Sequence, residues 1–244
     1  GWRVLKKHRE NIRLGADVFN GGVIKPPTQK RLLIAFKRMA RLTKKYKTDR
    51  SLAYATSAFR DATNKKPILS AIYKTSGIRI QVITGTREAE LIRKAVQNAI
   101  GIHGEKCLLL DIGGGSIELT EIYKNKINFS KSFKLGMVRM LSEARELNIR
   151  PQVYLKKKLQ QENKNFPHSR FDLVIGTGGN IDSISKLKLL LLKKGPNTVV
   201  TQKEVAKIYK LFVKTPVERR MAKFNLKADR VDVLEPALYL VLTL

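Results

Sequence analysis

The sequence predicts an α/β fold, because short apolar strands alternate with amphipathic helices and two of those strands run directly into glycine-rich turns. A chain of 244 residues can form one large or two small domains and bury a substantial core. The two turns are Gly113-Gly114-Gly115 and Gly176-Thr177-Gly178-Gly179. These turns are the first candidates for a ligand site.

The first third of the chain is expected to contain helices over residues 28–46 and 58–74 and strands over residues 52–55 and 78–83. The first helix has a cationic outer face. The second is expected to end at Gly77, with Pro67 as a candidate break. A further helix opens at Gly85, with Thr86 as its cap and Glu88 in its first turn.

The rest of the chain is expected to contain strands over residues 106–110, 117–123, 126–133 and 172–175 and helices over residues 139–147, 151–163, 180–194 and 201–213. The last helix begins with a capping box formed by Thr201 and Glu204. The composition changes at the glycine-bearing segment 101–104, which is a candidate hinge.

The charge is strongly one-sided. Lys and Arg number 49 against 20 Asp and Glu, which gives a net charge of +29 at pH 7. Such a balance predicts a polyanionic partner, which can be nucleic acid, an anionic membrane surface or a phosphate-rich small molecule. Zinc-finger spacing, aromatic RNA-binding signatures and basic-zipper heptads are missing from the sequence, which disfavours a dedicated nucleic-acid module without excluding nucleic acid by charge.

Cysteine usage and hydropathy favour a cytoplasmic protein. The single cysteine, Cys107, cannot form an internal disulfide and lies in an apolar run, so we expect a buried thiol in a reducing compartment. The longest apolar stretch, residues 187–192, is far too short to span a bilayer, so neither a transmembrane helix nor a membrane partner is expected. Residues 1–7 lack the apolar core of a signal peptide.

The segment from Asp111 to Glu118 combines two features of a phosphate and metal site. Gly113, Gly114 and Gly115 lack side chains, so backbone N–H groups can converge on a phosphate, with the Ser116 hydroxyl beside them. Asp111 and Glu118 bracket the turn, and hard oxygen ligands beside phosphate are suited to Mg²⁺. A tight glycine hairpin explains the same residues equally well. The segment is not a Walker loop, because no Gly-Lys-Ser/Thr follows it.

The second glycine turn precedes a helix, whose positive end could hold an anion near Gly178 and Gly179. Arg60 follows the hydroxyls of Thr56 and Ser57 at another strand end, where a guanidinium could clamp phosphate oxygens. A structural turn and a surface arginine are the simpler alternatives. The three histidines, His8, His103 and His168, have no metal-ligand spacing and are expected at the surface.

Taken in order, these segments resemble the exopolyphosphatase and guanosine pentaphosphate phosphohydrolase family, whose fold is that of the actin and sugar-kinase superfamily. The resemblance covers nearly the whole chain and rests on residues 9–15, 55–64, 83–89, 111–118, 135–139, 176–179 and 228–232. It implies two actin-like domains, over residues 1–104 and 105–244, with an active cleft between them.

The resemblance also implies a role for each candidate residue. Glu88 would be the general base that activates water, and Asp111 with Glu118 would organise Mg²⁺. Phosphate would be bound by the glycine loop with Ser116, by Arg60, and by Gly178 and Gly179 on the other domain's side of the cleft. The chemistry implied is in-line attack of water on a terminal phosphoryl group of polyphosphate or guanosine pentaphosphate. A homodimer is left open.

The sequence departs from the family pattern in three places. The strand and Asp-x-Gly-Ser-Asn loop that open family members do not occur, and Arg87 precedes Glu88 where the family has a second acidic residue. The chain ends at Leu244, in what resembles the last strand region of the second domain.

Two alternatives to a phosphohydrolase stay open. One is a non-catalytic protein that has lost the first phosphate loop and binds polyphosphate or nucleic acid through its basic surface. The other is a sugar or acid kinase of the same superfamily, which the Glu88 segment and the lack of a sugar-binding motif disfavour.

Overall fold

The computed structural model describes residues 3–100, 104–124, 126–167, 170–193, 195–196 and 198–244. These residues form two compact units, over residues 1–83 and 84–244, which are described separately. This division falls before the boundary expected near residue 104, because the helix over residues 85–100 packs against the strands of the second unit. His103, His168 and residues 101–103 of the expected hinge lie outside the described residues.

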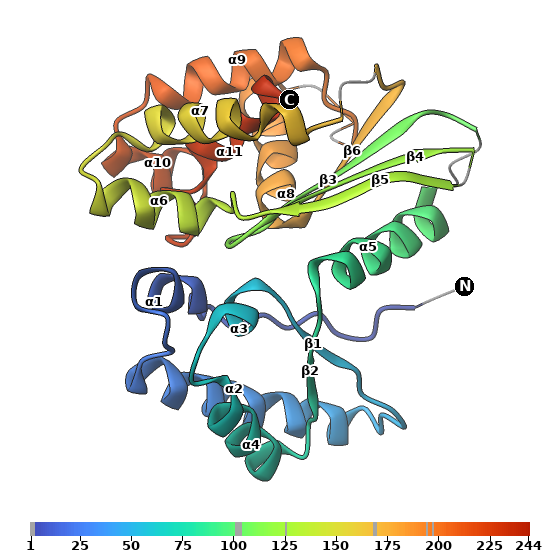
Figure 1. Ribbon diagram of the computed structural model, residues 1–244, viewed down its shortest axis with the longest axis vertical. Helices are drawn as coiled ribbons and strands as arrows, with labels where there is room; N and C mark the ends of the chain where they lie inside the picture. Colours follow the sequence, from blue (N-terminus) through green and yellow to red (C-terminus); the bar gives the residue numbers. More distant parts are fainter. Residues whose placement is uncertain (1–2, 101–103, 125, 168–169, 194, 197) are drawn as a thin grey trace. The chain divides into compact units, whose positions relative to one another are not determined.

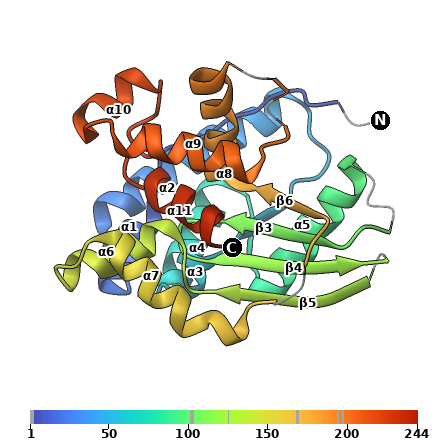
Figure 2. The same ribbon diagram turned by 90° about the horizontal axis from the view of Figure 1, so that it is seen from above.

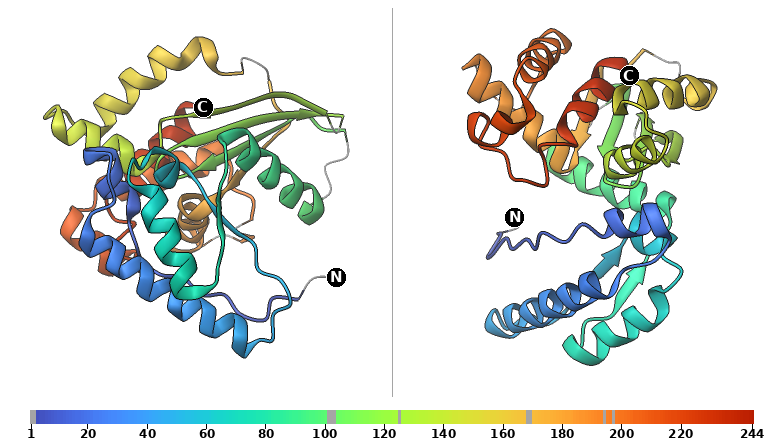
Figure 3. Two further views of the ribbon diagram at one scale, coloured as in Figure 1. Left: turned by 60° about the horizontal axis from the view of Figure 1, so that its bottom comes forward. Right: turned by 90° about the vertical axis from the view of Figure 1, so that its left-hand side faces the viewer.

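The first unit contains four helices and two short strands among its described residues: α1 (Leu14–Gly21), α2 (Pro26–Lys45), β1 (Ala53–Ala55), α3 (Ser57–Asp61), α4 (Lys65–Ser76) and β2 (Ile80–Val82). The strands pair in parallel, with Ala53 opposite Ile80. Helices α2 and α4 lie side by side (Figure 3). Apolar side chains from all four helices and from β1 form one core in this unit.

The helix expected over residues 58–74 is two helices. α3 ends at Asp61 and α4 begins at Lys65, so the break precedes Pro67. Pro67 occupies the first turn of α4, where a missing N–H leaves no hydrogen bond unmade. Gly77 ends α4 as expected, with a φ of +71° that suits glycine. Helix α1 was not expected from the sequence.

The second unit is built on a mixed four-stranded sheet of β3 (Cys107–Ile112), β4 (Ile117–Tyr123), β5 (Lys126–Phe133) and β6 (Leu173–Thr177). The strand order is β5-β4-β3-β6, and β6 runs parallel to β3 while the other pairs are antiparallel (Figure 2). The expected strands therefore exist, and both glycine turns follow strands that lie next to one another.

Helices cover both faces of this sheet (Figure 1). One face packs against α5 (Gly85–Ile100) through a small cluster that includes Val96 and the buried Cys107. The other face carries the main core, with α6 (Met137–Glu146), α7 (Pro151–Glu162) and α11 (Leu234–Thr243). Alternate residues of β3 serve the two faces, since Leu108, Leu110 and Ile112 point into the main core.

The remaining helical elements are η1 (Asn163–Asn165), α8 (Gly178–Leu187), the π-helical turn η2 (Lys188–Leu192), α9 (Gln202–Val213) and α10 (Val217–Lys223). The predicted capping box of α9 is present, with Thr201 and Glu204 bonded reciprocally.

The prediction of a strand near Leu244 is wrong, because residues 234–243 form α11. Leu234, Ala237 and Leu238 are fully buried at helical spacing. Among the described residues, no helix has both the length and the apolar character needed to cross a membrane.

Candidate functional site

Two carboxylates meet where β3 ends and β4 begins. Asp111 and Glu118 are directly opposite one another in the antiparallel ladder, so their side chains leave the sheet on the same face. That face is the one covered by α5, because the alternate residues of β3 point to the main core. Strand alternation therefore places both carboxylates beside the start of α5.

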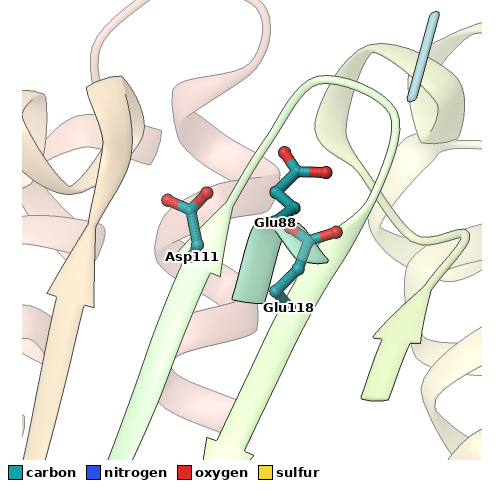
Figure 4. A group of neighbouring side chains, drawn as sticks. All are labelled: Glu88, Asp111 and Glu118. Carbon is teal, nitrogen blue, oxygen red and sulfur yellow. The ribbon is translucent and has the colours of Figure 1, made fainter. Parts of the chain in front are cut away.

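Glu88 joins them from the first turn of α5. The helix begins at Gly85, and the Thr84 hydroxyl accepts a hydrogen bond from the Arg87 N–H at 3.2 Å. The capping residue is thus Thr84 rather than the expected Thr86. One carboxylate oxygen from each of Glu88, Asp111 and Glu118 lies within 4.8 Å of the others (Figure 4).

Burial disfavours the charged forms of Asp111 and Glu118 in this cluster. Glu118 is only 3% exposed, and burial raises its pKa to about 7, with the neighbouring Glu88 and Asp111 charges adding to the rise. The hydroxyls of Ser116 and Ser132 donate hydrogen bonds to Glu118 and partly oppose that rise. Burial also raises the pKa of Asp111, against a hydrogen bond of 2.8 Å from the Thr177 hydroxyl.

These residues fit a divalent cation. Three carboxylates with oxygen atoms close enough to share one ion offer the hard oxygen donors that Mg²⁺ prefers. Burial is the first cause of the raised pKa values of Asp111 and Glu118, so their charged forms are disfavoured without a ligand. A bound cation would stabilise those charged forms.

The loop of Gly113, Gly114, Gly115 and Ser116 closes the hairpin next to the carboxylates. The Gly113 N–H donates to the Ser116 carbonyl at 3.0 Å. All three glycine carbonyls face α6: those of Gly113 and Gly114 accept N–H groups of its first turn, and the Gly115 carbonyl accepts Nε of Arg139 at 2.9 Å. Within the described part of the chain, no hydrogen bond is found to the N–H groups of Gly114 and Gly115. The N–H groups of Gly114 and Gly115 are thus available to donate to an anion, while the carbonyl groups of the loop already accept hydrogen bonds from α6.

Gly136 explains how α6 comes so close to the loop. A Cβ atom at this position would lie 2.3 Å from the Gly115 carbonyl carbon and from the Ser116 nitrogen. Real contacts of that kind do not occur, so only glycine permits this approach. Helix α6 is therefore packed directly against the glycine loop.

The second glycine turn also borders the carboxylates. β6 is paired with β3, which places Thr177 opposite Asp111. Gly178 follows with a φ of +88°, and a Cβ atom there would lie 2.6 Å from Oδ1 of Asp111. The Gly178 turn thus lies against Asp111, two residues before Gly113 in the chain, within the second unit.

Arg230 extends this turn with a cation. A Cβ atom on Gly179 would lie 2.5 Å from its Nη2 atom, and its Nη1 donates to Oδ1 of the buried Asn180 at 3.1 Å. The Nδ2 atom of Asn180 in turn donates to the Ile112 carbonyl at 2.9 Å. The Arg230 guanidinium therefore lies against Gly179 at the start of α8, and a cation beside a helix N-terminus favours an anion.

The structure brings the predicted residues Glu88, Asp111, Gly113–115, Ser116, Glu118, Gly178 and Gly179 together in the second unit. Arg60 lies in the first unit, on α3, where its Nη1 donates to the Ile83 carbonyl at 2.9 Å. Glu88, expected in the first domain, belongs to the second unit.

Sequence reasoning quoted Thr177, Gly136, Arg139 and Arg230 within motifs but gave them no role. Their contacts depend on the fold, because Arg139 bonds to the Gly115 carbonyl and Arg230 lies against Gly179 only in the folded chain. Ser132 carried no signal, because only the register of β5 places it opposite Glu118.

The chain resembles proteins of known name. It is 27% identical over 246 residues to a bifunctional 3-dehydroquinate synthase/phosphatase of Fusobacterium nucleatum, covering 94% of this chain and 37% of that protein. It is 30% identical over 139 residues to exopolyphosphatase 1 of Mycobacterium bovis, covering 57% of this chain and 40% of that protein. The chain thus spans well under half the length of these curated relatives.

Solved structures show the same fold. An exopolyphosphatase from Cytophaga hutchinsonii matches with a TM-score of 0.79 and 25% identity, over 94% of this chain and 78% of that one. A Ppx/GppA family member from Aquifex aeolicus matches with a TM-score of 0.71 and 23% identity, over 94% and 77%. The predicted two-domain actin-like α/β fold is therefore confirmed. The Ppx/GppA phosphatase family model matches residues 2–244, and the chain accordingly belongs to the Ppx/GppA phosphatase family.

Proposed function

We propose that this chain carries the catalytic part of a Mg²⁺-dependent phosphohydrolase that removes the terminal phosphoryl group of inorganic polyphosphate, guanosine pentaphosphate or both. The observation that supports this most directly is the approach of Glu88, Asp111 and Glu118 to within 4.8 Å, next to two glycine turns. Relatives named exopolyphosphatase and the family match support the same reaction class.

In this proposal Asp111 and Glu118 hold the cation, and the N–H groups of the glycine loop hold the terminal phosphoryl oxygens. A bound Mg²⁺ would neutralise charge on those oxygens. Glu88 accepts a proton from water as the water oxygen bonds to phosphorus. The phosphoanhydride bond then breaks, giving orthophosphate and a chain one phosphate shorter.

The positive groups around the carboxylate cluster would stabilise the negative charge of the transition state. Charge spreads over the phosphoryl oxygens during transfer, so fixed donors stabilise it without reorganising. At the start of α8, Gly178 lies against Asp111 and Arg230 lies against Gly179, so the N–H groups of this turn and the Arg230 guanidinium suit this role. Arg60, in the first unit, stays a predicted phosphate ligand. A net charge of +29 favours long polyphosphate over a single nucleotide, because a many-charged chain can bind many cations.

A homodimer and a cytoplasmic location stay predictions.

The test is phosphate release from polyphosphate with Mg²⁺ by the wild type, Glu88→Gln and Glu90→Gln. Glu90 is the matched control, since it lies on the same helix turn but pairs with Arg87 at 2.6 Å and Lys94 at 3.3 Å. We expect E88Q to lose about 10²- to 10⁴-fold in release while binding polyphosphate normally, and E90Q to stay active.

Unchanged turnover of E88Q would remove Glu88 from the mechanism. A wild-type protein that binds polyphosphate over a salt series but releases no phosphate would favour the non-catalytic alternative. ADP release in a coupled assay with ATP and a sugar or an acid would favour the kinase alternative.

A further inference from the structure

Helix α2 carries more positive charge than any core or site requirement explains. Its 20 residues contain seven cations and no acidic residue. All seven are exposed: Lys30, Arg31, Lys37, Arg38, Arg41, Lys44 and Lys45.

The seven cations share one face of the helix. At about 100° per residue, they fall within an arc of about 140°, opposite the buried residues Thr28, Leu32 and Ala35. From Lys30 to Lys45 the row is about 22 Å long, at a rise of about 1.5 Å per residue. The outer face of α2 is therefore a straight cationic stripe.

Acidic partners do not neutralise this stripe. Among the described residues, only Arg38 of the seven has an ion pair with a carboxylate, to Glu10 at 3.2 Å. Over residues 1–83 the sequence has 20 Lys and Arg against 4 Asp and Glu, a net charge of +16. The charge is thus denser in the first unit than in the chain as a whole.

We infer that the outer face of α2 binds the body of a long polyphosphate chain, as a site separate from the carboxylate cluster of the second unit. This inference rests on the proposed function for its choice of ligand. Cations spaced along a helix release counterions from a polyanion and so bind it without recognising its ends.

The residue composition of this face favours polyphosphate over single-stranded nucleic acid. Single-stranded nucleic acids are held by aromatic side chains that stack on bases, in addition to cations. The aromatic residue of α2, Phe36, packs against the core of the first unit, and the exposed apolar residue within the stripe is Ile34. A face that offers charge without stacking matches a polymer made of phosphoryl groups alone.

The role of the stripe is to anchor long chains while their ends are processed. Chains too short to reach along the stripe gain nothing from it. Loss of the stripe should therefore raise KM for long polyphosphate and leave tripolyphosphate turnover unchanged.

The test is binding of fluorescently labelled long-chain polyphosphate in EDTA, across a salt series, to three forms of the full chain. They are the wild type, the α2 variant Lys37→Gln/Arg41→Gln/Lys45→Gln and the α9 variant Lys203→Gln/Lys207→Gln/Lys210→Gln. The second variant removes the same charge from exposed positions on another helix.

We plot the logarithm of the binding constant for polyphosphate against the logarithm of the salt concentration. For the α2 variant we expect the slope of this plot to be less steep by about 2, which corresponds to about 100-fold weaker binding at 0.1 M salt. The α9 variant should stay within about threefold of wild type. Equal losses in both variants would mean that net charge alone matters and would overturn the inference. So would an RNA of equal charge that displaces polyphosphate at equal or lower concentration.

Because EDTA stops metal-dependent hydrolysis, this binding result is independent of the proposed activity. A wild type without phosphate release, together with selective loss of binding in the α2 variant, would refute the proposed function and keep the α2 site.

Discussion

Glu118 offers a direct test of the site's electrostatics through the variant Glu118→Gln. The substitution keeps the size of the side chain and an oxygen that can accept the 2.7 Å hydrogen bond from Ser132, but it removes the titratable group. Any change in the pH dependence of stability then reports on the carboxylate itself.

The sign follows from the direction of the shift. The pKa of Glu118 is raised from 4.5 to about 7 in the folded protein, so the folded state holds this proton more tightly than the unfolded state. Its contribution to stability is complete below pH 4.5 and is lost as the pH rises through about 7. A shift of this size corresponds to about 3 kcal/mol.

The assay is urea unfolding of wild type and E118Q at pH 5 and pH 8, with EDTA present. The difference in unfolding free energy between the two proteins should change by about 2.5 kcal/mol between these pH values, in favour of E118Q at pH 8, because a small part of the contribution is already lost at pH 5. Parallel pH dependence of the two proteins would refute the account of a buried, charge-crowded carboxylate. With Mg²⁺ in place of EDTA, the wild type should gain stability at pH 8 and E118Q should gain less.

Three further predictions concern backbone and cap positions. Gly136→Ala should displace the glycine loop, since the new atom would lie 2.3 Å from Gly115, and should cost about 2 kcal/mol or more in urea unfolding. Gly21→Ala, where nothing lies within 4 Å, is its control and should be neutral. Gly178→Ala should cost about 1 to 3 kcal/mol, because its φ is +88°, and should weaken Mg²⁺ binding measured by calorimetry. Normal Mg²⁺ affinity would contradict its contact with Asp111. Thr201→Ala should cost about 1 kcal/mol by removing the capping box of α9, and an unchanged urea midpoint would contradict that cap.

Local patterns predicted most of the second unit. The strands over residues 107–112, 117–123 and 126–133 were predictable because apolar runs ended at glycines or polar turns. Helix α11 was missed because Leu234–Thr243 is nearly all apolar, and such a run can be a buried strand or a buried helix. Its burial against α9, α7 and α8 decides the matter, and that packing is not local information.

The candidate site was predictable in its residues but not in its arrangement. The three glycines indicated a site for a phosphate, and the flanking Asp111 and Glu118 indicated a site for a cation beside it. That both side chains share a face depends on the register of β3 and β4, and that Glu88 joins them depends on α5 covering that face. The pKa of Glu118 follows from burial, which the sequence alone does not provide.

The close fit of Gly136 against the glycine loop has a consequence for ligand affinity. Because the loop's carbonyl groups accept the first N–H groups of α6, the loop backbone is held in place by folding, and binding of phosphate need not order it. Affinity at the loop is thereby linked to the packing of Met137 and Met140 in the interior. Substitutions that loosen those methionines would weaken anion binding without touching a single charged group.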